Sequence, residues 1–424
     1  MQIFKTGKLT FIMDAQAGSS GKARTASYVA ARYGGKDRNV TFACNTFSSN
    51  AAHWTRLRDG RKFLYKALNS MAYDHERYEK FYIGPGAAIE TQDVLKEIEE
   101  NSLPAHKLGI HPLTVVVQEM DAGYEKGVLG FDGEELLTKH DGTMKTGSTC
   151  SGVGAASARR ALRRPTTLYA KDVPALKPFV CDVSNQIIAR LEHGESGFQE
   201  IAQGYQLSLM HSYFAPYTTY RNVTVAQALS DMMLPTKYAG PVILNLRTYP
   251  IRINSNKYIG TDGTHITQAD IEAGVPHTVY KGNSGPWYPD QTELTWDEVT
   301  RMAGAPHSLA EITSKTKLAR RVATFSRLNV AEAIRDNDTG EGVVLALNFA
   351  DYVDYTMAGQ TSPGKMTTKF VSWIKENLGD HSKRLALIGT GANTEDTIDL
   401  GMLETARAAY DAQGNAYEPC EAIQ

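Results

Sequence analysis

The sequence is poor in cysteine and has no marked excess of either charge. Its 424 residues include 4 cysteines, and 45 lysines and arginines against 47 aspartates and glutamates leave a formal net charge of −2. The cysteines, Cys44, Cys150, Cys181 and Cys420, form no CxxC pair, so neither a zinc site nor a disulfide framework is indicated. The balanced charge argues against a nucleic-acid or membrane-surface partner, which would call for a basic excess.

Long apolar runs are also absent. No stretch approaches the roughly 18 apolar residues needed to span a bilayer, and the first residues lack the apolar segment of a secretory signal. With 42% hydrophobic and 22% charged residues, the composition is that of a globular protein. We therefore expect a cytoplasmic protein with reduced thiols and no membrane partner.

Strand and helix signals alternate near the N-terminus. The apolar run Leu9–Asp14 predicts a buried strand, the Gly-Ser-Ser-Gly-Lys sequence at 18–22 a turn, residues 23–33 a helix, and residues 40–44 the next strand. This order predicts an α/β fold with right-handed crossovers, in which helices flank a large, mostly parallel central sheet.

Similar patterns recur along the rest of the chain. Further strands are expected at 82–83, 113–117, 242–246, 343–347 and 385–388, and further helices around 93–101, 154–163, 328–335, 365–377 and 394–412. Residues 257–308 are less regular and rich in Gly, Pro, Asn, Asp and Thr. We expect one domain over residues 1–424, with a loop insertion at about 257–308 and a C-terminal helical tail.

The turn after the first predicted strand carries the first chemical signal. In AQAGSSGKAR, residues 15–24, backbone N–H groups and the positive end of the following helix favour a phosphate, and Lys22 adds a cation. The segment is not a complete P-loop, because the first glycine of GxxxxGK[ST] is missing.

This turn resembles the N-terminal GDEGKGK signature of adenylosuccinate synthetases at Gln16, Gly18, Gly21 and Lys22. Ser19 stands where that family has an aspartate, which removes the purine N1 proton and binds Mg²⁺. Similar motifs follow in the family's order: NAAH at 50–53, IGPG at 83–86, GST at 147–149, ARRALR at 158–163, AQG at 202–204, PYTTYRN at 216–222, LRTYPIR at 246–252, EITSKTKLARR at 311–321, NFAD at 348–351 and GTG at 389–391. The resemblance covers about residues 9–393, and its P-loop-like fold is the one predicted above.

The resemblance implies a ligase that forms a C–N bond between L-aspartate and a purine nucleotide. It assigns catalytic roles to Ser19, Lys22 and His53, with His53 as general acid, and Mg²⁺ contacts to Ser19 and Ala52. It also implies a homodimer, because the counterpart of Arg159 reaches the monophosphate of the neighbouring subunit. The implied nucleotide-monophosphate contacts are Ser19, Asn50, Ser148, Thr149, Arg159, Gln203, Thr219 and Ile253.

Two further sets of contacts follow from the resemblance. Binding the two carboxylates of L-aspartate needs several hydrogen-bond donors and positive charges, which the segment 311–321 contains. Without the resemblance, such a basic segment would be read as a solvated helix face. The aspartate set is Thr313, Ser314, Lys315, Thr316, Lys317, Arg320 and Arg321. The triphosphate set is Gly18, Ser20, Gly21, Lys22, Ala23, Arg24, His53, Asn348, Asp351, Gly389, Thr390 and Gly391.

The serine at position 19 leaves the identity of the purine substrate undecided. A serine is not an ionised base at neutral pH without activation, so either activity is lost or the substrate differs. Purine C2 lies beside N1, and the shorter, neutral Ser19 leaves space for a 2-amino group. A bacteriophage branch of the family has the same change and makes N6-succino-2-amino-2′-deoxyadenylate from dGMP, towards 2,6-diaminopurine nucleotides, with ATP or dATP as donor.

The resemblance therefore favours ligation of L-aspartate to dGMP at the expense of ATP or dATP, in the host cytoplasm if the source is a bacteriophage. Phe349, in place of the family's lysine, is compatible with an adenine donor. Two alternatives stay open. One is an ordinary adenylosuccinate synthetase acting on IMP with GTP, and the other is a non-catalytic nucleotide-binding paralogue.

Overall fold

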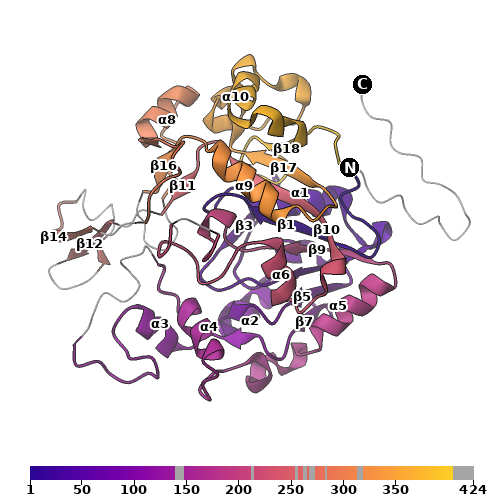
Figure 1. Ribbon diagram of the computed structural model, residues 1–424, viewed down its shortest axis with the longest axis vertical. Coiled ribbons are helices and arrows are strands. Elements are labelled where there is room, and N and C mark those ends of the chain that lie inside the picture. The colour runs from indigo at the N-terminus through magenta and orange to yellow at the C-terminus, as the bar shows by residue number, and fades with distance from the viewer. Residues whose placement is uncertain are drawn as a thin grey trace, which may run out of the picture.

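The centre of the protein is a nine-stranded sheet (Figure 1). The computed structural model describes residues 1–138, 148–211, 214–253, 256–260, 265–266, 273–281, 284–312 and 319–403. The strand order is β19-β18-β17-β10-β1-β9-β2-β5-β7, and every adjacent pair is parallel except β18 and β19. The strands are β1 (Leu9–Asp14), β2 (Val40–Asn45), β5 (Lys80–Ile83), β7 (Leu108–Ile110), β9 (Ser196–Glu200), β10 (Ala239–Arg247), β17 (Val343–Asn348), β18 (Leu385–Gly389) and β19 (Thr397–Asp399).

Both faces of the sheet are buried, as expected for parallel strands covered by helices on each side. Successive side chains of β1 alternate between two apolar clusters, with Phe11 and Met13 in one and Ile12 in the other. All six residues of β1 are buried. The continuous apolar run therefore predicted a strand enclosed on both sides.

The helices divide between these two faces. Apolar residues of α5, α6, α8, α9 and α10 join the cluster that contains Phe11, whereas those of α1 and α2 join the cluster that contains Ile12. No helix in the described ranges is long and apolar enough to cross a membrane. The bounds are α1 (Lys22–Tyr33), α2 (Thr91–Glu100), α3 (Glu119–Glu125), α4 (Val153–Ala161), α5 (Val183–Glu192), α6 (Val225–Asp231), α8 (Trp296–Ala303), α9 (Arg327–Asn337) and α10 (Thr368–Leu378).

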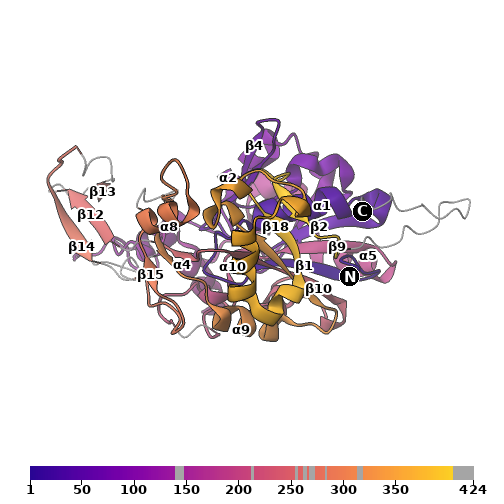
Figure 2. The same cartoon turned by 90° about the horizontal axis from the view of Figure 1, so that it is seen from above.

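Small sheets lie outside the central one. Figure 2 shows β12 and β14 projecting from one side of the molecule. The pairs and triplets are β3 (His53–Arg56) with β4 (Lys62–Tyr65), β6 (Ala88–Ile89) with β8 (Val115–Val116), β16 (Arg321–Ala323) between β11 (Ile251–Arg252) and β15 (Glu293–Leu294), and β12 (Asn256–Gly260) between β13 (His265–Ile266) and β14 (His277–Lys281).

The predicted α/β class is confirmed, and most predicted elements are present. The strand predicted at 113–117 is wrong in extent, because a turn between His111 and Thr114 precedes it and only Val115–Val116 pairs, with β6. The helix predicted from 394 is wrong as far as residue 403, because Thr397–Asp399 pairs with β18 as an edge strand. Residues 404–424, including the predicted tail, lie outside the described residues.

Two further differences concern segments with weak apolar patterns. Strand β9 was not predicted, because its sequence SGFQE has one apolar side chain, although all five residues are buried. The segment 257–308, predicted as irregular, contains helix α8, which begins with a capping box between Thr295 and Glu298.

Candidate active site

The loop between β1 and α1 lies at the carboxyl ends of the central strands, the edge at which α/β sheets bind ligands. Gly18, Ser19 and Gly21 have positive φ angles of 90°, 55° and 81°. Asp14 at the end of β1 fixes the turn by accepting hydrogen bonds from the backbone N–H of Gln16 at 2.8 Å and of Ser20 at 3.1 Å. A left-handed conformation at a non-glycine residue costs about 1–3 kcal/mol, so the surrounding contacts must hold Ser19 in place.

Several residues of the predicted triphosphate set converge behind this loop. The side chain of Asn348 hydrogen-bonds to the Ser20 carbonyl and to the guanidinium of Arg24. A Cβ atom on Gly389 would lie 2.0 Å from Arg24 Nη2, and one on Gly21 would lie 3.0 Å from the Asn348 amide. Ala23 and Ser20 are buried in the same region. The structure therefore brings Gly21, Arg24, Asn348 and Gly389 of the predicted triphosphate set together.

The arginine of this cluster is enclosed by protein. Arg24 Nη1 donates to the Asp396 carbonyl at 3.1 Å, and burial lowers the pKa of Arg24 to about 10. Thr390 Oγ1 donates to the Gln360 carbonyl at 2.7 Å, and a Cβ on Gly391 would approach the Asp396 carboxylate. Arg24 and Thr390 thus shape the edge of the loop through protein contacts of their own.

Lys22 and His53 meet at Glu200, the last residue of β9. His53 Nδ1 lies 3.4 Å from Glu200 Oε1, and the imidazole stacks on Phe47 with ring centroids 3.9 Å apart. His53 Nε2 is buried without a hydrogen-bond partner among the described residues. Lys22 Nζ donates to the Gln203 carbonyl at 2.8 Å. These two predicted catalytic side chains therefore share one buried region.

Burial and the neighbouring charges determine the protonation states of Lys22, His53 and Glu200. Burial lowers the pKa of His53 and of Lys22, and the carboxylate of Glu200 partly offsets both shifts. Burial alone would raise the pKa of Glu200, but His53, Lys22 and a hydrogen bond from Ser70 hold it below its usual value. Glu200 is thus the ionised partner of a neutral imidazole, whose Nδ1–H faces the carboxylate.

The predicted monophosphate contacts lie on loops around this group. Gln203 Nε2 donates to Asn50 Oδ1 at 3.3 Å, and Gln203 itself has a positive φ of 67°. Thr219 Oγ1 is buried without a partner in the described part of the chain. Ser148 and Thr149 are half-buried just before α4, and Ile253 is half-buried after β11. A buried, unsatisfied hydroxyl is costly, so Thr219 is suited to a ligand.

The N-terminus of α4 is occupied by a protein carboxylate. Glu125 accepts hydrogen bonds from the backbone N–H groups of Gly152, Gly154 and Ala155 at 2.8–3.1 Å. A phosphate held by the preceding loop would therefore meet Ser148 and Thr149 instead of these amides. Sequence reasoning missed Glu125, which lies more than twenty residues before the glycines that it contacts.

Arg159, which is predicted to contact a neighbouring subunit, is directed into its own chain in this structure. Its side chain is 1% exposed and its Nε and Nη2 both donate to Asp121 Oδ1, at 3.1 and 2.7 Å. Nη2 also donates to the Phe131 carbonyl at 2.8 Å. The positive charge of Arg159 is thus paired inside its own chain in this structure, and its contact with a neighbouring subunit stays a prediction.

The predicted aspartate residues divide into three groups. Thr313, Ser314, Lys315, Thr316 and Lys317 lie outside the described residues. Arg321 makes a double contact with Glu293, at 2.7 Å through both Nε and Nη2. Arg320 has a weaker partner, since its Nε lies 3.9 Å from Glu311 Oε2. Of these two arginines, Arg320 therefore has the less closely paired positive charge and is the better placed to bind an anion.

Arg247, at the end of β10, was not predicted as a site residue. Its side chain is fully buried, its Nη1 donates to the Ser19 carbonyl at 3.0 Å, and it forms a double contact with Glu311. Its guanidinium lies 4.0 Å from the centroid of the Phe349 ring. An arginine directly after an apolar strand was the available sequence signal, because the carboxyl end of a parallel strand faces the ligand edge.

Asp351 lies in the 3₁₀ turn Ala350–Tyr352 after β17. Burial raises the pKa of this carboxyl to about 7, although Arg24 and Arg247 act in the opposite direction. Phe349, just before it, adopts a left-handed φ of 64°. The turn thus places a weakly acidic carboxyl beside the Arg24 cluster.

The described residues contain no group of three His, Cys, Asp or Glu side chains suited to hold a metal. Ser19 and Ala52, the predicted Mg²⁺ contacts, are both exposed. Their hydroxyl and carbonyl oxygens are hard donors of the type that Mg²⁺ accepts, and Mg²⁺ commonly takes its other ligands from phosphates and water. The residues present therefore fit a cation carried mainly by the nucleotide.

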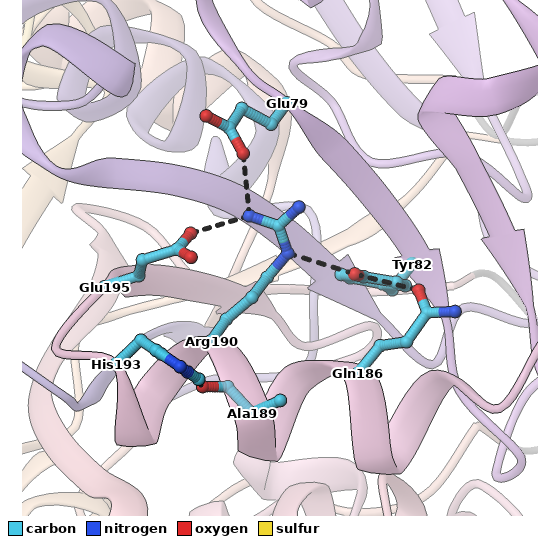
Figure 3. A pocket seen from close by; sticks show the side chains of 7 residues that line it. All are labelled: Glu79, Tyr82, Gln186, Ala189, Arg190, His193 and Glu195. Atoms are coloured by element: carbon cyan, nitrogen blue, oxygen red, sulfur yellow. Dashed lines mark hydrogen bonds and ion pairs between the residues drawn. The ribbon is translucent and has the colours of Figure 1, made fainter.

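A surface hollow of about 490 Å³ lies at the opposite edge of the sheet (Figure 3). Arg190 of α5 occupies it, with Nη1 donating to Glu79 at 2.9 Å and to Glu195 at 2.6 Å. Glu79 and Glu195 directly precede β5 and β9, so this hollow is at the amino ends of the strands. Its charged groups satisfy one another and are separate from the candidate site.

Comparison with known proteins agrees with the class that this fold and loop define. No protein-family model matches the chain. The structure of adenylosuccinate synthetase from Plasmodium falciparum shares the fold, with a TM-score of 0.67 at 14% identity over 92% of this chain and 99% of that one. The protein thus has the fold of the adenylosuccinate synthetases.

Two phage proteins narrow this class. The N6-succino-2-amino-2′-deoxyadenylate synthase of Acinetobacter phage SH-Ab 15497 is 31% identical over 81% of this chain and 84% of its own. The cyanophage S-2L succinoaminodeoxyadenylate synthetase, in a structure bound to dGMP and dATP as an energy donor, has a TM-score of 0.68 and 29% identity over 92% of this chain and 95% of that one. The chain belongs to the family of N6-succino-2-amino-2′-deoxyadenylate synthases, which are C–N bond-forming ligases.

Proposed function

We propose that this protein ligates L-aspartate to C6 of dGMP at the expense of ATP or dATP, giving N6-succino-2-amino-2′-deoxyadenylate, the nucleoside diphosphate and phosphate. The observation that carries the proposal is the buried Lys22–Glu200–His53 group beside a loop in which Ser19 replaces an acidic residue. Family membership supports the same reaction class.

Two steps conserve the atoms. The purine O6 first takes the γ-phosphoryl group of the donor, and the N1 proton leaves the ring to the solvent. The amine of L-aspartate then attacks C6, the C6–O6 bond breaks, and phosphate departs with the former O6 and with the proton that the amine loses. Phosphoryl transfer depends mainly on positioning and charge neutralisation. Lys22 supplies a cation at the phosphate loop for the first step.

His53 acts as the general acid in this scheme. In the resting protein the imidazole is neutral, because burial lowers its pKa, and Nδ1–H faces Glu200. A proton received on the unpaired Nε2 creates an imidazolium that Glu200 stabilises. This protonated form donates to the developing charge at O6.

Ser19 shapes the base pocket in the proposal. A serine hydroxyl beside N1 leaves room for the 2-amino group of guanine and carries no negative charge. Mg²⁺ neutralises the triphosphate when bound, with Ser19 and Ala52 as the proposed protein contacts. Arg320 is the principal proposed ligand for a carboxylate of L-aspartate, since its own partner is 3.9 Å away.

The proposal extends to the setting of the enzyme. We propose that it works in the cytoplasm as a homodimer of single-domain subunits. Arg159 is the proposed contact with the monophosphate of the neighbouring subunit, and to make this contact its guanidinium must leave Asp121 of its own chain. The exposed residues Leu162, Arg163 and Arg164 at the end of α4 are available on the surface of the protomer.

One assay distinguishes the candidate functions. Purified protein is incubated with Mg²⁺, L-aspartate and ATP or dATP, and is offered dGMP or IMP, while phosphate release and product mass are followed. A parallel incubation uses IMP with GTP. We expect product from dGMP. Turnover of IMP alone would identify an ordinary adenylosuccinate synthetase, and nucleotide binding without turnover would identify a non-catalytic paralogue.

A further inference from the structure

Arg247 contacts the phosphate loop at both of its ends. Its backbone N–H donates to Gln16 Oε1 at 2.8 Å, and Gln16 Nε2 donates back to the Arg247 carbonyl at 3.2 Å. At the other end of the loop, Arg247 Nη1 donates to the Ser19 carbonyl at 3.0 Å. The end of β10 therefore serves as the surface against which the loop is shaped.

The peptide group between Ser19 and Ser20 is held from two sides. Its carbonyl accepts from Arg247, and its N–H donates to Asp14 Oδ2 at 3.1 Å. Ser19 has a φ of 55°, a conformation that a serine leaves readily unless it is held. Because the direction of the Cα–Cβ bond follows the backbone, these two hydrogen bonds determine where the Cβ atom of Ser19 lies and so limit the positions that its hydroxyl can reach.

Glu311 fixes Arg247 in turn. The carboxylate makes contacts with Nη1, at 3.2 Å, and with Nη2, while Nε of Arg247 donates to the Tyr249 carbonyl at 2.7 Å. The face of the guanidinium rests on Phe349. With all three guanidinium nitrogens directed, the buried arginine has one orientation, and Glu311 supplies the only carboxylate that contacts it in the described residues. A planar fork can satisfy these three directions together, whereas an ammonium cannot.

We infer that Arg247, oriented by Glu311, is a specificity-determining positioning residue, which holds the Ser19–Ser20 peptide so that the enzyme distinguishes a purine with a 2-amino group from one without it. The inference rests on the proposed function, because it concerns the same base pocket. Arg247 acts through Ser19 and not by contact with the reacting atoms. Its loss therefore changes the choice between purines more than it changes the common chemistry.

The test compares selectivity, the ratio of kcat/KM for dGMP to kcat/KM for IMP. Arg247→Lys keeps the charge but loses the fork, and is expected to lower this ratio at least fivefold. Glu311→Gln keeps the shape of the side chain and is expected to lower the ratio in the same direction. The double variant is expected to lose no more selectivity than Arg247→Lys alone, because both changes act through one contact.

Arg190→Lys is the matched control. Arg190 also holds two glutamates, but at the amino ends of the strands (Figure 3), so its replacement should leave selectivity within twofold of the unmodified protein. An equal fall of kcat/KM for both purines in Arg247→Lys would show a merely structural role and overturn the inference. If the losses of selectivity from the two changes add up in the double variant, Arg247 and Glu311 do not act through one contact, and that part of the inference is overturned.

Binding measurements separate this inference from the proposed function. The ratio of the dissociation constants for dGMP and IMP is measured by calorimetry on the same proteins. If the unmodified protein does not convert dGMP, the proposed function fails, and the dissociation constants still decide the inference. If Arg247→Lys does not fold, as judged by thermal unfolding, Glu311→Gln carries the test, and an unchanged ratio in that variant overturns it.

Discussion

Glu200 contacts His53 at Nδ1, 3.4 Å away, and thereby leaves Nε2 of the same ring buried and free of any described partner. The carboxylate selects the tautomer, since an ionised oxygen accepts a hydrogen bond from Nδ1–H. The side of the imidazole that can exchange a proton with a substrate is therefore Nε2. Glu200 thus orients the imidazole of His53 and stabilises its protonated form, but does not itself exchange a proton with the substrate.

Glu200→Gln should weaken this arrangement without emptying the space. We expect kcat to fall about 10- to 100-fold, less than the 10²–10⁴-fold that loss of the acid itself in His53→Asn would cost. The pKa of His53 should also fall further, because Glu200 raises it in the intact protein. The measurement is the pH profile of kcat, whose alkaline limb, where His53 loses the proton that it must donate, should move to lower pH. An unchanged profile would remove Glu200 from the mechanism.

Lys22→Gln should separate binding from chemistry. The amine contacts the Gln203 carbonyl, which a glutamine amide can also approach, but the positive charge is lost. We expect kcat to fall at least about 100-fold, in keeping with electrostatic stabilisation of the transferring group, while the dissociation constant of dGMP changes by less than tenfold. Steady-state kinetics with calorimetry measures both. A kcat within threefold of the unmodified value would contradict the assignment.

Ser19→Asp tests the pocket argument directly. The longer, charged side chain should occupy the space proposed for the 2-amino group and lower kcat/KM for dGMP by at least about tenfold. Ser19→Asn is the neutral control of equal size, and it separates the effect of bulk from that of charge. Product formation from dGMP and IMP is followed for each variant. Unchanged dGMP turnover in Ser19→Asp would count against the pocket.

Asp351→Asn should change how stability depends on pH. The pKa of the folded carboxyl is raised to about 7 by burial, against 3.8 for the unperturbed group. The folded state therefore holds a proton that the unfolded state has lost between these values, and stability falls as pH rises through this range. Asparagine removes this cost, so the stability of the variant relative to the original protein should rise by about 2–3 kcal/mol between pH 5 and pH 8.

The measurement for Asp351→Asn is denaturant unfolding at several pH values. Asp338→Asn, an exposed change after α9, is the control and should show no such trend. A stability difference for Asp351→Asn that stays constant from pH 5 to pH 8 would contradict the raised pKa.

Gly204→Ala should displace the phosphate loop, because Gly204 packs directly against the loop backbone. A Cβ at this position would lie 1.9 Å from the Gln16 carbonyl oxygen and 2.7 Å from the Gly18 nitrogen, both of which are backbone atoms. We expect a loss of about 3 kcal/mol in the free energy of unfolding and of most activity. Gly364→Ala is the control, since its nearest atom is 3.9 Å away. Equal stability of the two variants would show that the loop can move aside.

Local patterns were sufficient for much of the fold and for part of the site. The apolar runs of β1, β10 and β17 predicted buried strands because parallel strands are covered on both faces. The turn at Gly18–Lys22 and the position of His53 followed from motif order. Strand β9 was missed because its burial comes from its neighbours in the sheet and not from its own composition.

The partners of the predicted residues could not be predicted in the same way. Glu200, Arg247 and Glu125 act through pairings between residues far apart in sequence, which single motifs do not encode. Arg159 shows the converse. The resemblance implied an arginine that reaches a neighbouring subunit, whereas in this structure Asp121 and the Phe131 carbonyl hold its guanidinium inside the chain.

The position of β1 in the sheet has a consequence for biosynthesis. This strand leaves the ribosome first, but its two neighbours, β9 and β10, begin only at Ser196 and Ala239. The partners of Arg24, which are Asn348 and the Asp396 carbonyl, are synthesised later still. The nascent N-terminal segment therefore carries the phosphate-loop sequence, with Asp14 as its local support, before β9, β10 and Asn348 are present to hold it. The complete set of contacts around this loop can therefore form only after the segments as far as Asp396 have been synthesised and have folded against it.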